Sequence, residues 1–329
     1  MSAGETPPVL FLVYKRPEVT QTVFNAIRAA RPAKLFVGAD GPKENRPDDI
    51  PKIAAVRRIV QNVDWPCEVK HLFQERNVGS KVAESTAISF FFDQVEEGII
   101  LEDDCLPDAS FFPYCAELLA RYRHDTRVMH IGGNNFQFGR KIGDGSYYFS
   151  QFPSCWGWAS WRRAWKLHDP NMSNYPEFKE QRQIANIIFD GHIRRQFSGY
   201  FDTCYFKKAD AWDYPWAYTI LSNRGLCILP NTNLVTNIGF GADSTSCVDA
   251  NSAVAGVPTG RLSELIHPRF MLYSVEADKA VFYRFHPPWY LHAVAEFVRV
   301  TFPRRVYEWC MRAYLVMYRR LHRATLHAE

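Results

Sequence analysis

The chain has 329 residues, of which 47% are hydrophobic, 15% aromatic and 22% charged, and its net charge is +4. This composition is typical of a globular protein and excludes a disordered or low-complexity chain. Residues 288–329 carry seven arginines and three acidic residues, which account for the whole net charge, whereas the rest of the chain is neutral. A neutral body excludes an extended basic surface, so no nucleic-acid partner is expected.

The first half of the chain alternates between apolar runs and helical patterns. Strands are predicted at 8–14, 34–40, 68–73, 98–101 and 127–131, and helices from Pro17, over about 80–95 and over 108–123, where Asp108 is a candidate N-cap. This alternation predicts an α/β fold with an open, mostly parallel sheet flanked by helices. Ligands of such sheets bind beyond the carboxyl ends of the strands. Residues 14–16, 40, 102–104 and 132–135 are therefore expected around one crevice.

The eight cysteines are scattered, without the C-x-x-C pairs typical of zinc sites, and the N-terminus MSAGETPP does not resemble a signal peptide. We therefore expect free thiols and a cytoplasmic protein. A disulfide-bonded chain is the alternative.

Three consecutive carboxylates end the fourth predicted strand, in the segment GIILEDDCLPDASFF at 98–112. Glu102, Asp103 and Asp104 lie where an apolar run meets the start of a helix. Carboxylate oxygens together with water and phosphate oxygens are what Mg²⁺ or Mn²⁺ prefers, so one hypothesis is a divalent-cation site. The alternative is a charged loop that only ends the strand.

Several motifs in one order give the chain a resemblance to a known family. They are PVLFLVYKRPE, LFVGADGP, ILEDDCLPDASFF, GGNN, FPSCWGW, AWDYPW and NIGFG, spread over residues 8–250. Together they resemble the GT-A glycosyltransferases, most closely the inverting N-acetylglucosaminyltransferase I-like family and its bacterial relatives of unknown specificity. The resemblance implies a Rossmann-like GT-A sheet and metal-dependent transfer from a nucleotide-diphosphate sugar, with uridine as the expected base.

Roles follow from the resemblance by position. Asp104 would bind Mn²⁺ or Mg²⁺, and Glu102 and Asp103 would contact the ribose and donor sugar. The other residues expected to line the nucleotide sugar are Tyr14, Arg16, Asp40, Arg76 and Lys81. The helix start after ERNVGSK favours phosphate on physical grounds. Solvated strand ends are the alternative for Arg16, Arg76 and Lys81.

The acceptor side is expected in 136–250. The resemblance makes Asp213 of AWDYPW the general base, with Asp210 as the alternative; a helix N-cap is the structural interpretation of Asp213. Six of the nine tryptophans fall between 156 and 216, and most are expected in the core, but Trp158 and Trp212 could stack on an acceptor sugar. Asn134 and Asn135 could bind sugar hydroxyls or only turn the chain.

The predicted organisation has three parts. Residues 1–250 form the GT-A domain, with a nucleotide-sugar half at 1–135 and an acceptor half at 136–250, and 251–287 form a linker. Residues 288–329 form a basic amphipathic helical extension, which either lies on an anionic membrane surface or packs on the protein. A membrane-bound tail would suit a lipid-linked glycan acceptor and a peripheral position on the cytoplasmic face of the membrane.

Two other functions are alternatives to a glycosyltransferase. A sugar-1-phosphate nucleotidyltransferase would need a glycine-rich loop after the first strand, where this chain has FLVYKRPE. A non-catalytic protein that binds nucleotide sugars or glycans on the same scaffold would bind the donor without releasing its sugar.

Overall fold

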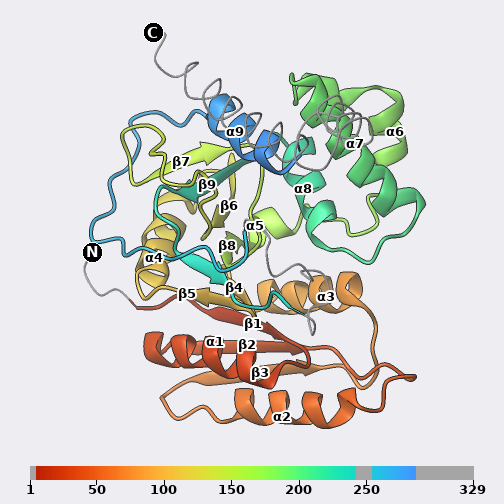
Figure 1. Ribbon diagram of the computed structural model, residues 1–329, viewed down its shortest axis with the longest axis vertical. Helices are drawn as coiled ribbons and strands as arrows, with labels where there is room; N and C mark the ends of the chain where they lie inside the picture. The colour runs from red at the N-terminus through yellow and green to blue at the C-terminus, as the bar shows by residue number, and fades with distance from the viewer. Residues whose placement is uncertain (1–4, 242–253, 287–329) are drawn as a thin grey trace, which may run out of the picture. The chain divides into compact units, whose positions relative to one another are not determined.

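A computed structural model of the chain describes residues 5–241 and 254–286 (Figure 1). The chain divides into two compact units, residues 1–278 and 279–329, and the fold described below is that of the first. The predicted basic tail at 288–329 lies outside the described residues.

An eight-stranded sheet forms the centre of the first unit, in the order β3-β2-β1-β4-β8-β6-β9-β7. Its strands are β1 (Val9–Val13), β2 (Lys34–Ala39), β3 (Glu68–Phe73), β4 (Glu97–Glu102), β6 (Val128–Gly132), β7 (Tyr147–Ser150), β8 (Trp158–Trp161) and β9 (Leu226–Pro230). All run parallel except β7 and β8, which are antiparallel to their neighbours. This confirms the predicted α/β fold with a mostly parallel, Rossmann-like sheet flanked by helices.

Helices cover both faces of the sheet. Successive side chains of each strand point to opposite faces, and both faces are apolar. Val9, Phe11 and Val13 of β1 pack with α1 (Pro17–Ala30), α2 (Asp49–Gln61) and α4 (Phe111–Tyr122). Leu10 and Leu12 point to the other face, where they pack with α3 (Ser80–Phe92), α5 (Arg162–Trp165) and α8 (Asp213–Ser222). Beyond α5 lie α6 (Tyr175–Glu180), the 3-10 helix η1 (Gln183–Asn186) and α7 (Gly191–Phe206), which packs against α8 (Figure 1).

Two local elements differ from the sequence predictions. Helix α4 begins at Phe111 rather than 108, because residues 108–110 form a turn after β5 (Cys105–Pro107), which pairs with β10 (Val235–Asn237). Asp108 does not cap the helix; its Oδ1 accepts a hydrogen bond from the Ser110 backbone N–H in the turn that precedes it. Helix α2 was not predicted at all.

Residues 254–278, which the sequence predicts to be part of a linker, belong to the same compact unit as the sheet. Leu262 donates its backbone N–H to the Ser110 hydroxyl, and Ser274 donates its own to the Phe149 carbonyl oxygen. Helix α9 (Val275–Phe285) starts at the end of this segment.

Asp278 is buried at the end of this unit, where it accepts hydrogen bonds from the Ser150 hydroxyl and the Gln151 backbone N–H. Burial raises the pKa of its carboxyl group to about 7. A carboxyl whose pKa is higher in the folded than in the unfolded state loses stabilisation as the pH rises through that interval. Between pH 5 and 8 the wild type should therefore lose on the order of 2–3 kcal/mol of unfolding free energy relative to Asp278→Asn. Urea unfolding of both proteins at each pH measures this difference, and parallel pH dependences would contradict it.

The cysteines and the apolar character of the helices can also be given for the described residues. All six cysteines that lie among them are free thiols, as predicted. Within residues 5–241 and 254–286, no helix combines the length and apolar character needed to cross a bilayer.

Candidate active site

A cavity of about 310 Å³ lies at the carboxyl ends of β1, β2 and β4, closed on its far side by α3 and the start of α8. Strand β1 lies between β2 and β4, so this is the point where the chain changes direction along the sheet, the usual position for a ligand in such folds. Nine of the predicted site residues line it: Tyr14, Arg16, Asp40, Glu102, Asp103, Asp104, Asp210, Trp212 and Asp213. The structure thus brings together residues from three widely separated parts of the sequence.

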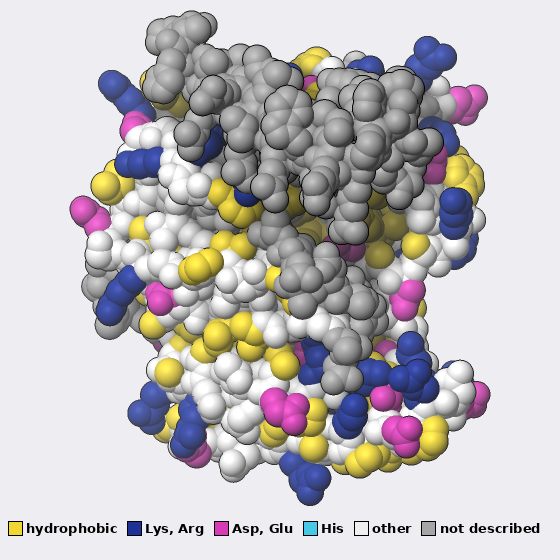
Figure 2. All heavy atoms as spheres, in the orientation of Figure 1, with side chains coloured by type: hydrophobic (Ala, Val, Ile, Leu, Met, Phe, Trp, Pro, Cys, Tyr) yellow, Lys and Arg dark blue, Asp and Glu magenta, His cyan; other side chains and the backbone are white. Residues whose placement is uncertain are grey.

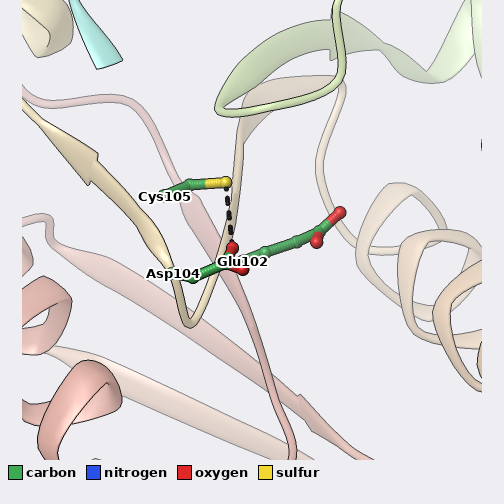
Figure 3. Close-up of side chains that lie close together, drawn as sticks. All are labelled: Glu102, Asp104 and Cys105. Carbon is green, nitrogen blue, oxygen red and sulfur yellow. Dashed lines mark hydrogen bonds between the residues drawn. The ribbon is translucent and has the colours of Figure 1, made fainter. Parts of the chain in front are cut away.

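Glu102 is the last residue of β4, and Asp103 and Asp104 form the turn to β5; Figure 3 shows the side chains of Glu102 and Asp104. Pairing of β5 with β10 holds this turn, and the Asp104 carbonyl oxygen accepts a hydrogen bond from the Ile238 N–H at 2.9 Å. Gly239 follows in the NIGFG motif, where a Cβ atom would lie 2.3 Å from the Asp104 carboxylate. The glycine therefore allows the backbone to approach the acids.

Arg16, from the β1–α1 turn, neutralises part of this charge. Its Nη2 forms ion pairs with Asp103 and, at 2.9 Å, with Asp104 Oδ2, and its Nη1 donates to the Gly239 carbonyl oxygen at 3.4 Å. Burial nevertheless raises the pKa of Asp103, because desolvation outweighs the attraction of Arg16. Burial beside Glu84 also raises the pKa of Glu102 well above its usual range.

The potential metal ligands in this turn are Glu102, Asp104 and Cys105, whose ligand atoms lie within 4.8 Å of one another. Figure 3 shows the Cys105 thiol above the Asp104 carboxylate, to which it donates a hydrogen bond at 3.5 Å. Burial raises the pKa of this thiol well above its ordinary value, so it stays protonated. Carboxylate oxygens suit a hard divalent cation, whereas sulfur suits softer metals.

Asp40 lines the cavity, but its carboxylate is used to organise the protein. Oδ1 accepts from the backbone N–H groups of Gly41 and Val78 at 2.7 and 3.0 Å, and Oδ2 accepts from the Asn77 side chain at 2.7 Å and the Gly79 N–H at 3.2 Å. The Asn77 amide also lies 3.3 Å from the Tyr14 hydroxyl. Asp40 therefore shapes the wall against which a nucleotide would lie.

The two candidate bases have different surroundings. Asp210 accepts from the backbone N–H groups of Ser80 and Lys81 at 3.0 and 2.7 Å, so it caps α3 from a distant part of the chain. Gly79, with φ +85°, makes room for it, because a Cβ there would lie 2.8 Å from the Asp210 carboxylate. Asp213 is the first residue of α8, after the N-cap Trp212, and burial raises its pKa.

Trp158 was predicted to be an acceptor contact, and the structure contradicts this. It is completely buried and stacks on His130 and Trp212, so neither face is free for a sugar. The half-buried Trp156 of the same motif lines the cavity instead.

Asn134 and Asn135 are also buried, which supports the alternative interpretation that they organise the chain. Their side-chain amides donate to the backbone carbonyl oxygens of Val235 and Pro230 at 2.9 and 2.6 Å. Arg76 is exposed, and Lys81 directs its amino group to Asn171; neither lines the cavity. These two positions are therefore less suited to bind a donor than the sequence predicts.

The sequence analysis missed several cavity residues, and Glu84 is the acidic one among them. It lies on α3 and lines the cavity. The sequence offered one indication of its role: Glu84 directly follows the first of the apolar residues at 83, 87 and 91, which recur at helical spacing.

Charged side chains on the exterior do not gather into one basic surface on the face seen in Figure 2, where lysines and arginines are interspersed with aspartates and glutamates. The visible part of this face therefore has charges of both signs side by side.

No protein-family model matches the sequence, and comparison with curated proteins finds no match either. Among solved structures, HddC from Yersinia pseudotuberculosis is similar to 49% of this chain over 78% of its own length, with 8% identity and a TM-score of 0.31. The 4-diphosphocytidyl-2C-methyl-D-erythritol synthase from Anaerococcus prevotii is similar to 54% of this chain over 85% of its own length, with 8% identity and a TM-score of 0.31. The glycosyltransferase GlyE of Streptococcus pneumoniae is similar to 68% of this chain over 45% of its own length, with 10% identity and a TM-score of 0.32. Similarities this weak do not place the chain in any of these families.

Proposed function

We propose that the protein is a metal-dependent glycosyltransferase that moves a sugar from a nucleotide diphosphate, expected to be a uridine diphosphate, to a glycan or lipid-linked acceptor with inversion. The observation that carries this proposal is the convergence of Arg16, the acids at 102–104 and Asp213 on one cavity at the switch point of the sheet. The motif order of the sequence supports it independently, although AWDYPW has tyrosine and proline where the family's motif carries a second acid.

The charge of the cavity supports a divalent cation. Seven acidic residues line it against three basic ones, and two of those three, Lys15 and Arg16, are paired with Asp49 and with the acidic turn. Asp104, with Glu102 beside it, would hold Mn²⁺ or Mg²⁺. A bound divalent cation would stabilise the charge that develops on the leaving diphosphate. Arg16, next to Asp104, is placed to add its own positive charge to the same group.

Asp213 is the proposed general base. Deprotonation of an acceptor hydroxyl is most efficient when the pKa of the base approaches the working pH, and burial moves the pKa of Asp213 upward, in that direction. Asp213 lines the same cavity as the acids at 102–104, so the donor and the base would share one site.

Binding and turnover of donors test the proposal together. Thermal shift and calorimetry with uridine, guanosine and adenosine diphosphate sugars, each with Mn²⁺, Mg²⁺ or EDTA, should reveal a metal-dependent preference for one base. Slow release of the sugar to water should then follow for the bound donor. Binding without any release would favour a non-catalytic binding protein, and pyrophosphate release from a nucleoside triphosphate and a sugar 1-phosphate would favour a nucleotidyltransferase.

The sequence of the tail leads to a separate prediction about membrane association. Residues 288–329 combine seven arginines with a helical pattern of apolar residues, which suits an interfacial helix on an anionic leaflet. The full chain should therefore co-sediment with phosphatidylserine-containing vesicles, and a chain ending at residue 286 should not. Equal sedimentation of the two forms would contradict the prediction.

A further inference from the structure

Glu84 has one carboxylate oxygen bound and one free. Its Oε1 accepts a hydrogen bond from the Ser80 hydroxyl, one turn earlier on α3, at 3.1 Å. Its Oε2 is removed from solvent and, within the described part of the chain, has no hydrogen-bond partner. A carboxylate oxygen buried without a partner costs free energy, so such an atom calls for an explanation.

The surroundings of Glu84 are acidic. Glu102, Asp103, Asp210 and Asp213 all act electrostatically on Glu84 or are acted on by it. The structure therefore gathers carboxyl groups from α3, from the end of β4 and from the start of α8 in one part of the cavity. Burial and these neighbours raise the pKa of Glu84 to about 8.

The helix holds Glu84 firmly in this unfavourable position. Asp210 accepts from the backbone N–H groups of Ser80 and Lys81 and so anchors the first turn of α3, while the Ser80 hydroxyl orients the Glu84 carboxyl group. A glutamate needed only for helix formation could turn toward solvent. Glu84 is instead kept in the cavity with an unused oxygen.

We propose that Glu84 binds a hydroxyl group of the donor sugar through Oε2, and that the carboxyl groups around it make the site reject donors whose sugar carries a carboxylate. This inference rests on the proposed function, because it assumes that Arg16 and Asp104 mark the position of the diphosphate. The sugar then lies beyond them, between Glu84, Glu102 and Asp213. A hydroxyl there satisfies the free oxygen, whereas a further carboxylate would lose hydration beside carboxyl groups that already disfavour one another's ionisation.

The test measures affinity by calorimetry for UDP, UDP-glucose, UDP-galactose, UDP-N-acetylglucosamine and UDP-glucuronic acid with Mn²⁺. The proteins are the wild type, Glu84→Ala, Glu84→Gln and a control, Glu180→Gln, which changes an exposed glutamate at the end of α6. Glutamine keeps a hydrogen-bonding group of similar size. Comparison of the two variants therefore separates the loss of the carboxylate from the loss of side-chain volume. Unfolding by heat, followed without ligand, verifies that each variant is folded.

The wild type should bind its best neutral donor more tightly than UDP and should bind UDP-glucuronic acid no better than UDP. Glu84→Ala should weaken the neutral donor about tenfold and leave the affinity for UDP unchanged, with partial recovery in Glu84→Gln. Equal affinity of wild type and Glu84→Ala for the neutral donor, or an equal loss for UDP itself, would overturn the role of Glu84. Failure of the wild type to bind any of the five nucleotides would instead count against the proposed function.

Discussion

Replacing Asp104 by alanine is expected to abolish the metal-dependent part of donor binding. The wild type should bind a uridine diphosphate sugar at least about 100-fold more tightly with Mn²⁺ than with EDTA, and Asp104→Ala should show the same weak affinity in both. The physical reason is that Asp104 supplies a carboxylate oxygen at the point where the acidic turn meets the cavity. Calorimetry with and without Mn²⁺ measures the difference.

The fold should survive this change. Arg16 keeps its ion pair with Asp103, and the removal of one carboxylate lessens the repulsion within the turn. The melting temperature of Asp104→Ala without metal should therefore equal or exceed that of the wild type. Asp64→Ala, which removes an exposed carboxylate paired with Arg28, is the control for loss of an acid elsewhere. A Mn²⁺ dependence that persists in Asp104→Ala would remove this residue from the metal site.

Replacing Asp213 by asparagine is expected to reduce transfer and leave donor binding intact. Asparagine keeps the shape of the side chain but cannot accept the proton of an acceptor hydroxyl. Transfer should fall by roughly 10²–10⁴-fold, the usual contribution of a positioned base, while the affinity for the nucleotide sugar stays near the wild-type value. The rate of the wild type should also rise with pH through the raised pKa of Asp213, and the variant should lose this rise. The assay requires an acceptor, identified first in a pooled glycan screen.

Asp210→Asn is the matched control for this experiment. Because Asp210 caps the first turn of α3, its replacement should mainly lower stability, by about 1 kcal/mol, as is usual when a helix cap is weakened. Loss of transfer in Asp213→Asn and loss of stability in Asp210→Asn would thus distinguish the proposed base from the residue that caps α3. If Asp210→Asn lost transfer while Asp213→Asn retained it, the roles of the two residues would be exchanged.

The sequence alone determined five of the eight strands, β1 to β4 and β6, and the location of the cavity, whereas β7, β8 and β9 were not predicted. The apolar runs of β1, β2 and β4 are long enough, and bounded clearly enough, for the strands to be predicted, and a parallel sheet brings their carboxyl ends to one edge. Tyr14, Arg16, Asp40 and the acids at 102–104 therefore meet without knowledge of the structure. Helix α2 had a comparable signal, in Ile53, Val56 and Val60 at helical spacing, and the sequence analysis overlooked it.

Only the tertiary structure decided which of these side chains face the cavity and which are used within the protein. Trp156 and Trp158 are two residues apart, yet one lines the cavity and the other is fully buried, because burial depends on the helices that cover the sheet. The pairing of Arg16 with the acidic turn joins residues 87 positions apart, and the capping of α3 by Asp210 joins residues about 130 apart. Hydrophobic periodicity describes one element at a time, whereas these contacts arise where elements distant in sequence pack together. Glu84 was recognised as a site residue for the same reason, because its carboxyl group interacts with acids at the end of β4 and the start of α8, which the sequence of its own helix does not indicate.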